Sequence, residues 1–135
     1  MIDSEHVLFT YLKEDYALHQ LVEDRLWRIV ADDDYRVEHG PAIVVNITAN
    51  HPYEEIASNE VMVVEADINI YGVNPDVIKE VYARVVDLLN RVESAVVENV
   101  SIHPQLRGGQ ILREPESENY RLLAFLSALI LPVEG

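Results

Sequence analysis

The stretch Val61–Tyr71 (VMVVEADINIY), together with the helical pattern that follows it, decides the fold of this chain. Its even positions are all apolar, whereas Glu65, Asp67 and Asn69 occupy the middle of its odd positions. A period of two predicts a half-buried strand, because successive side chains of a strand point to opposite faces of the sheet. We therefore expect the even face to lie in the core and the odd face to meet water or a partner.

The residues Asn74, Pro75 and Asp76 predict the start of a helix directly after this strand. Asparagine is a common N-cap, proline suits the first helical position, and an acid there faces the positive end of the helix dipole. Apolar residues then recur at steps of three and four, which predicts a buried stripe about four turns long. The stripe consists of Ile78, Val81, Tyr82, Val85, Leu88, Leu89 and Val92. We expect this stripe to pack on the even face of the strand, as a helix laid on a sheet.

Two acid–base pairs are expected on the exposed side of this helix. They join Glu80 to Arg84 and Asp87 to Arg91. An acid four residues before a base lies on the neighbouring helical turn, where the ion pair stabilises the helix by roughly 0.2–0.5 kcal/mol.

The composition predicts a single soluble domain over residues 1–135. A chain of this length can bury roughly two thirds of the surface that its unfolded form exposes. Apolar residues make up 49%, but none of the apolar runs approaches the roughly 20 residues of a membrane span, and the amino terminus lacks a signal-peptide pattern. The absence of cysteine excludes disulfides, thiolate nucleophiles and cysteine zinc sites, and it fits a reducing cytoplasm.

The charge is strongly acidic, with 24 Asp and Glu against 10 Lys and Arg and a net charge of -14. A surface of this sign repels nucleic-acid phosphates, because affinity for DNA and RNA comes largely from Lys and Arg contacts to phosphate. Conventional DNA or RNA binding is therefore not expected.

Two short helices and a strand are expected at the start of the chain. Asp3 or Ser4 caps the first helix and Asp15 caps the second, as a helical hairpin or as one kinked helix. The β-branched and aromatic residues of Arg25–Val30 (RLWRIV) favour a strand. The acidic run Asp32–Asp34 predicts a solvated loop, because it lacks the alternating ligands and the glycine of a calcium loop.

A second long strand is predicted over Ala42–Ala49, where Ile43, Val45 and Ile47 share one face. The polar segment Asn50–Glu60 follows, and it is longer than the about two to five residues usual for a hairpin connection. Long loops of this kind are usually functional or mobile, so we expect this one to become ordered against a neighbouring molecule.

The last part of the chain predicts three further strands. Val97–His103 alternates apolar and polar residues, Gln105–Gly109 breaks the pattern, and Gln110–Arg113 forms a short strand. Tyr120–Leu131 has a helix-forming composition, yet it is apolar all round and bounded by turn signals. We take it as a strand and keep a helix as the alternative. The order of elements predicts an α+β fold, an antiparallel or mixed β-sheet with helices packed mainly on one face.

No arrangement of residues predicts a catalytic or metal site, so we expect neither a cofactor nor enzymatic activity. The five histidines are dispersed without the spacing of a ligand set. The densest polar cluster, His51–Glu55 (HPYEE), could supply a general base and two carboxylates but lacks a recognisable second half. Glu65 and Asp67 share one strand face, for which a solvated polar face is the simpler interpretation. The pair Gly108-Gly109 indicates a turn, because a phosphate-binding loop would need a helix after it.

The order of elements and several punctuating residues resemble the tail-terminator, or tail-completion, proteins of long-tailed bacteriophages, such as the lambda-type tail tube terminator. One similar feature is a short first helix followed by Asp15–Trp27 (DYALHQLVEDRLW). Others are the proline-led strand Pro41–Asn46, the strand ending Ile68–Tyr71 ahead of a long helix, and a closing strand after a polar turn. The likeness spans nearly the whole chain.

The resemblance implies an α+β domain assembled as a hexameric ring that caps the head-proximal end of the tail tube, ends its polymerisation and joins tail to head. The implied partners are the tail tube protein and the head–tail connector or neck protein. DNA would pass through without specific binding, and no membrane would be involved. The implied location is the virion tail, after assembly in the host cytoplasm, with no catalytic residues to carry over. The alternatives are a phage neck or baseplate adaptor, and a small metal- or ligand-binding enzyme that uses residues 50–60.

Polar residues on the odd strand face and in the connections are the candidates for the interface or the lumen of such a ring. They are Glu65, Asp67, Asn69, Tyr53, Glu54, Glu55, Arg107 and Arg113. An acidic lumen would let DNA pass, because Lys and Arg would bind its phosphates. Against a neighbour, Glu65 and Asp67 would instead need cationic partners to offset their desolvation. The possible partners are Arg25, Arg28, Arg107 and Arg113.

Overall fold

The computed structural model describes residues 3–53, 61–113 and 119–133, which form three α-helices and a six-stranded sheet. The helices are α1 (Ser4–Lys13), α2 (Tyr16–Val22) and α3 (Pro75–Leu89), with a short 3-10 helix, η1 (Val37–His39). The strands are β1 (Leu26–Arg28), β2 (Ala42–Pro52), β3 (Met62–Gly72), β4 (Ala95–Val97), β5 (Val100–Arg113) and β6 (Tyr120–Pro132).

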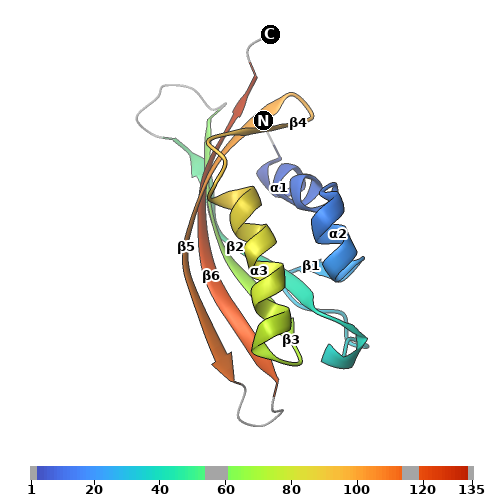
Figure 1. Cartoon of the computed structure of the whole chain (residues 1–135). Helices are drawn as coiled ribbons and strands as arrows, with labels where there is room; N and C mark the ends of the chain where they lie inside the picture. Colours follow the sequence, from blue (N-terminus) through green and yellow to red (C-terminus); the bar gives the residue numbers. More distant parts are fainter. Residues whose placement is uncertain (1–2, 54–60, 114–118, 134–135) are drawn as a thin grey trace.

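The sheet has the strand order β1-β2-β3-β6-β5-β4, in which β1 runs parallel to β2 and the other described pairs are antiparallel. All three α-helices lie on one side of this curved sheet (Figure 1). The prediction of an α+β fold with a mixed sheet and helices on one face is therefore confirmed. Across the described ranges, none of the helices is long and apolar enough to cross a membrane.

The predicted strand–turn–helix unit, β3 followed by α3, forms the centre of the molecule. β3 buries its even-numbered side chains and turns the odd-numbered ones to the other side of the sheet. α3 begins at the predicted cap, where Asn74 Oδ1 accepts a hydrogen bond from the Val77 amide at 3.0 Å. The helix ends at Leu89, so Val92 lies beyond the stripe that the sequence predicts.

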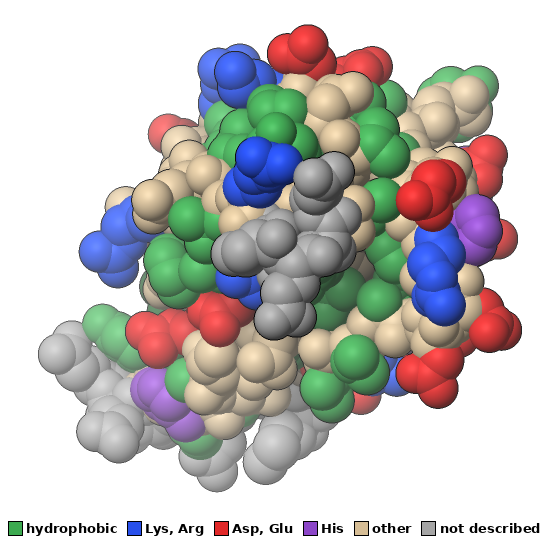
Figure 2. Space-filling view, turned by 90° about the horizontal axis from the view of Figure 1, so that it is seen from below, with side chains coloured by type: hydrophobic (Ala, Val, Ile, Leu, Met, Phe, Trp, Pro, Cys, Tyr) green, Lys and Arg blue, Asp and Glu red, His purple; other side chains and the backbone are tan. Residues whose placement is uncertain are grey.

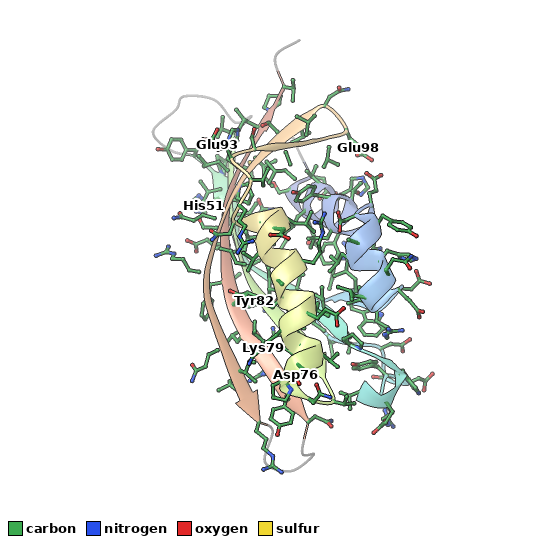
Figure 3. All side chains as sticks on the ribbon, in the orientation of Figure 1. His51, Asp76, Lys79, Tyr82, Glu93 and Glu98 are labelled. Atoms are coloured by element: carbon green, nitrogen blue, oxygen red, sulfur yellow. The ribbon has the colours of Figure 1, made fainter. Side chains whose placement is uncertain are left out.

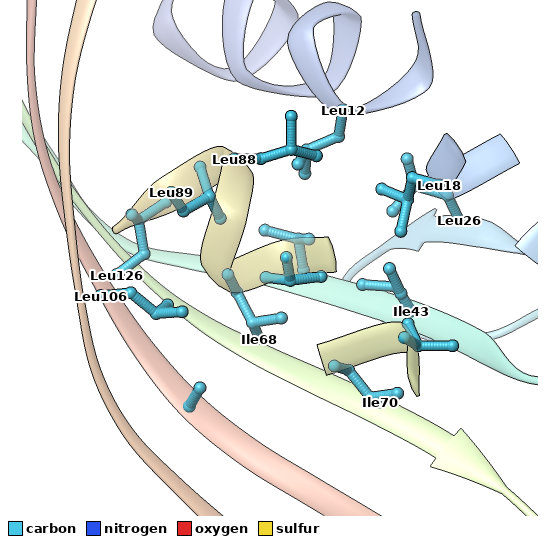
Figure 4. Packing of buried hydrophobic residues seen from close by; sticks show 14 of the residues in the cluster. Leu12, Leu18, Leu26, Ile43, Ile68, Ile70, Leu88, Leu89, Leu106 and Leu126 are labelled. Atoms are coloured by element: carbon cyan, nitrogen blue, oxygen red, sulfur yellow. The ribbon is translucent and has the colours of Figure 1, made fainter. Parts of the chain in front are cut away.

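The core lies between α3 and the sheet, and α1 and α2 extend it on the other side of α3. Figure 4 shows Leu12 of α1 beside Leu88 of α3, and Leu18 of α2 beside Leu26 of β1. Each fully buried aliphatic side chain contributes about 1.5–3 kcal/mol by leaving water. The three helices therefore share one apolar cluster and cover one face of the sheet.

Asp15 joins the α2 and α3 helices. Its Oδ2 accepts a hydrogen bond from the Leu18 amide at 2.8 Å, which confirms the predicted cap. The same carboxylate receives hydrogen bonds from Arg84 at 2.8 and 2.6 Å. The predicted pair of Arg84 with Glu80 is therefore wrong, because the guanidinium binds the largely buried cap instead. The other predicted pair forms between Asp87 of α3 and Arg91, which follows the helix, with 3.0 Å between nitrogen and oxygen.

The β4–β5 region differs from the prediction. The sequence predicts a strand over Val97–His103 and a break over Gln105–Gly109, but a two-residue turn at Glu98-Asn99 joins β4 to a β5 that continues without a break. The turn residues have φ values of 49° and 64°, the pattern of a type I′ hairpin turn. The glycine pair does not end β5, because a β-bulge there absorbs one residue and both glycines take positive φ, 89° and 118°.

β2 is longer than predicted, and β6 is a strand rather than a helix. β2 runs to Pro52, so the prediction of a loop is wrong for residues 50–52, while residues 54–60 lie outside the described ranges. β6 confirms the preferred interpretation of Tyr120–Leu131. Its burial alternates, however, whereas the sequence indicated a strand buried on both faces. The odd-numbered apolar side chains thus point to the face without α-helices, and they are Leu123, Phe125, Leu129 and Leu131.

Side chains shield the outer edge of β5, where β4 pairs only with the first three residues of the strand among those described. Pro104 has no N–H to donate along this strand. Asn90 Oδ1 accepts a hydrogen bond from the Leu106 amide at 3.3 Å. The Tyr82 hydroxyl donates to the Gly108 carbonyl at 2.8 Å. An unpaired sheet edge is a template for strands of other chains. These side chains therefore reduce the number of backbone N–H and C=O groups that β5 presents for such pairing.

Candidate functional site

The candidate site is the face of the sheet that no described α-helix covers, which we call the open face. It carries the outward side chains of β2, β3, β6 and β5. Its central residues are Thr48, Glu65, Asp67, Asn69, Gln105, Arg107, Leu123, Phe125, Ser127 and Leu129. Figure 1 shows the helices on the opposite side of these strands.

The strand register sets an acid, an aromatic ring and a base in one row on this face. Asp67 of β3 pairs with Phe125 of β6, which pairs with Arg107 of β5. Neighbouring strands lie about 4.8 Å apart, so the row spans about 10 Å from acid to base. In the next row Glu65 pairs with Ser127. A hollow of about 350 Å³ lies over these rows, lined by Thr48, Glu65, Asp67, Arg107, Phe125 and Ser127.

The charges of the open face do not neutralise one another. Within the described ranges, no ion pair joins Arg107 to Glu65 or Asp67. Arg25 and Arg28, which the sequence offered as partners for these acids, bind other carboxylates of their own chain at 2.8 and 2.7 Å. In the end-on view of Figure 2, acidic, basic and hydrophobic side chains are interspersed, and no continuous basic area is visible on that side.

β6 places an apolar column through the middle of the open face. Phe125 is 50% exposed and Leu129 is 37% exposed, and Leu123 lies on the same side of the strand. Sequence reasoning missed these residues, because it took the all-round apolarity of this strand for burial on both faces. The same pattern could have indicated them, since the predicted helices cover mainly one face of the sheet.

The Ile29-Val30 turn, which follows β1, is a second feature that sequence reasoning missed. The two side chains are 75% and 69% exposed, and Ile29 has a φ of 69°. A β-branched residue rarely adopts positive φ, and such a conformation costs about 1–3 kcal/mol. The predicted strand through Val30 is wrong at this end: β1 ends at Arg28, because Ile29 leaves the extended conformation.

Contacts on both sides hold this turn in position. The Ile29 amide donates a hydrogen bond to the Val45 carbonyl at 3.0 Å. Downstream, the Tyr35 ring packs against Trp27 with 5.2 Å between centroids, and its hydroxyl donates to the Gly40 carbonyl at 2.8 Å. Burial raises the pKa of Tyr35 to about 12. The contacts on both sides of Ile29 and Val30 therefore hold these two apolar side chains in a fixed position at the surface.

The residues of the enzyme alternative do not form a site within the described ranges. The His51 Nδ1 lies 3.0 Å from the carbonyl oxygen of the next residue, and Tyr53 follows β2. Figure 3 shows His51 well away from the polar residues at the start of α3. Glu54 and Glu55 lie outside the described residues. In the part of the chain that is described, no group of three or more His, Asp or Glu could hold a metal ion.

Of the eight candidate residues, the open face brings together four. They are Glu65, Asp67, Asn69 and Arg107. Arg113 lies at the far end of β5, where it pairs with Tyr120. The sequence therefore indicated the acidic side of the face, but the aromatic and aliphatic side chains between acid and base were not among its candidates.

Comparison with known proteins gives a likeness of fold. No family model matches the chain, and no curated protein matches it. Among solved structures, one chain of "Virion of native gene transfer agent (GTA) particle" is similar, with a TM-score of 0.67 and 13% sequence identity. The likeness covers 95% of this chain and 94% of that chain. In its fold, then, this α+β chain is similar to a component of that virion particle.

Proposed function

We propose that this chain is a structural protein of a tailed phage or phage-like particle, in which a hexameric ring of it caps the head-proximal end of the tail tube. The observation that carries the proposal is the fold likeness to a chain of the gene transfer agent virion over 95% of this chain and 94% of that chain. The sequence resemblance to tail-terminator proteins supports the position in the tail. The ring would end tube polymerisation and join tail to head.

The open face supports assembly with other copies. An antiparallel sheet with one solvated face usually alternates apolar and polar side chains along each strand. β6 departs from this pattern, because Phe125 and Leu129 remain half-exposed on the side without helices. Such a column is better explained by a neighbour that covers it than by water. A ring also needs two different surfaces on each subunit, since its contacts are head-to-tail.

The charge supports a passive passage for DNA. With a net charge of -14 per chain, the ring would repel phosphates rather than bind them. In this proposal the ring acts through its geometry and charge, without catalysis or a cofactor. Its partners are the tail tube protein on one side and the head–tail connector or neck protein on the other. It is assembled in the host cytoplasm and located in the virion tail.

Mass photometry over a concentration series, with electron microscopy of the protein alone and on tails, tests the proposal. We expect a species of six chains and a ring at the head-proximal end of the tail. A protein that is monomeric both in solution and on tails would overturn the ring. A ring at the distal end would favour the baseplate adaptor, and a 15.4 kDa monomer with one transition metal per chain would favour the enzyme.

A further inference from the structure

We propose that the Ile29-Val30 turn of one copy packs on the open face of a second copy, with its two apolar side chains against Phe125. The contact rests on the proposed function, because a head-to-tail contact between identical chains is what closes a ring. The proposed contact specifies which two surfaces of neighbouring copies meet in the ring, and in which orientation.

Both surfaces expose apolar groups that the single chain leaves in water. Ile29 and Val30 are 75% and 69% exposed on one side, and Phe125 and Leu129 are 50% and 37% exposed on the other. The hollow of about 350 Å³ beside Phe125 offers a concave site for a projecting turn. Packing the turn into this hollow removes both apolar groups from water together.

The turn cannot make this contact within its own chain. β1 lies three strands away from β6 in the sheet, which corresponds to roughly 14 Å between the two strands. The hydrogen bond from the Ile29 amide to the Val45 carbonyl also holds the turn against β2. The receiving face therefore belongs to another copy, and the contact joins a sheet edge to a sheet face.

The order of charges along the turn is opposite to the order across the open face. The turn reads base, two apolar residues, a small residue and acid from Arg28 to Asp32. The face reads acid, aromatic ring and base from Asp67 to Arg107. Four residue steps span at most about 13 Å, an upper limit that the bend at Ile29 shortens, and the row spans about 10 Å, so the length of the turn is compatible with that of the row.

This match fixes the orientation of the contact. Arg28 would lie over Glu65 and Asp67, and Asp32 would lie over Arg107. The Arg28 side chain is 60% exposed although it binds Glu5 at 2.7 Å, so its guanidinium can meet further carboxylates. Pairing in this orientation offsets the desolvation of carboxylates that have no ion-pair partner within the described chain.

The backbone of the turn supports an assembly role over a structural one. At a φ of 69°, glycine or asparagine would be less strained than isoleucine. Exposed isoleucine is therefore unfavourable at this position in the free chain. The same side chain becomes favourable once a second copy buries it.

The first test compares variants of the two surfaces in the full chain. Ile29→Asn should keep or raise the melting temperature, because it relieves the strain, while assembly weakens by about tenfold or more through the loss of a buried aliphatic group. Phe125→Ser should weaken assembly by a similar factor. Tyr16→Ser is the control, because Tyr16 is 76% exposed and belongs to α2, which lies on the other side of the sheet from the open face (Figure 1). Assembly of both test variants at the wild-type level would overturn the proposal.

The second test mixes the two variants. A copy with Ile29→Asn retains its open face and a copy with Phe125→Ser retains its turn, so together they should form a two-chain species but no ring. In one chain, Arg107→Asp should weaken assembly and the addition of Asp32→Arg should restore it. Failure of both rescues would overturn the pairing.

The failures of the two proposals are distinguishable. If the wild type forms rings and both surface variants form them equally well, the contact is overturned and the proposed function still stands. Head-to-tail oligomers that depend on both surfaces, yet never locate to tails, would support the contact and overturn the tail function. A wild-type chain that remains monomeric in solution and on tails would overturn both.

Discussion

Asp15 links α2 to α3 through its carboxylate. It caps α2 through the Leu18 amide and receives two hydrogen bonds from Arg84. Asp15→Ala should lower the free energy of unfolding by about 2–3 kcal/mol, because it removes both the cap and the charged pair. Asp15→Asn keeps a cap acceptor and should cost less. Urea unfolding measures both, with the exposed Asp24→Asn as a control expected within about 0.5 kcal/mol of wild type.

The pH dependence of stability follows from the same carboxylate. The hydrogen bonds from Arg84 lower the pKa of Asp15 from its ordinary value of 3.8. A lowered pKa in the folded state means that the stabilisation is complete above the unfolded-state value and is lost as pH falls through the folded-state value. The stability difference between wild type and Asp15→Asn should therefore be constant near neutral pH and shrink below about pH 4. A difference that stays unchanged down to pH 2 would contradict this account.

Arg84 shows why single residues are the hardest part to predict from sequence. The local spacing offered Glu80 as its partner, four residues away on the same helix. The actual partner is Asp15, which is 69 positions away in the sequence. The helix cap at Asp15 was predictable because it depends on the next three residues, whereas the ion pair depends on how α2 meets α3.

Among the elements, β5 places a specific demand on the backbone at its glycine bulge. A Cβ at Gly109 would lie 2.6 Å from the Tyr82 hydroxyl oxygen, and the residue has a φ of 118°. Gly109→Ala should lower the free energy of unfolding by about 1–3 kcal/mol through strain and displacement of Tyr82. The neighbouring Gln110→Ala should stay within about 0.5 kcal/mol of wild type. Chemical unfolding of the two variants, compared side by side, would refute the bulge account if both changed equally.

The elements differ in how well the local sequence predicts them. β3 was predictable to within one residue at each end and α3 at its start, because an alternating strand and a cap are local signals, whereas α3 ends three residues before the predicted stripe does. β5 was not predictable in this way. Its glycine pair indicated a turn, but in the structure the two glycines occupy a β-bulge in a strand that stays paired with β6. The acids of the open face were predictable from the period of β3. The contribution of Phe125 was not, since nothing in β6 alone shows which of its two apolar faces the helices cover.

At the scale of the whole molecule, the open face would lie in the proposed ring either at the lumen or against a neighbouring copy, and charge reversal distinguishes the two. Glu65→Lys with Asp67→Lys should break the ring, because these acids would then repel Arg28 of the next copy. A lumen position would leave the ring assembled and would slow DNA passage or make it sensitive to salt. Glu80→Lys with Glu93→Lys changes the net charge equally at exposed positions elsewhere and should leave the ring intact. Electron microscopy of both double variants measures the outcome.

The shielded edge of β5 affects how readily free copies of the protein aggregate before they assemble. Pro104, Asn90 and Tyr82 occupy positions where another chain would otherwise add a strand. These groups therefore disfavour extension of the sheet of one copy into the next along this edge, which is how strand addition would lead to a fibre. In the proposed tail function, surplus copies would stay folded, as single chains or as closed rings, and would remain available to later tails without aggregating along this edge.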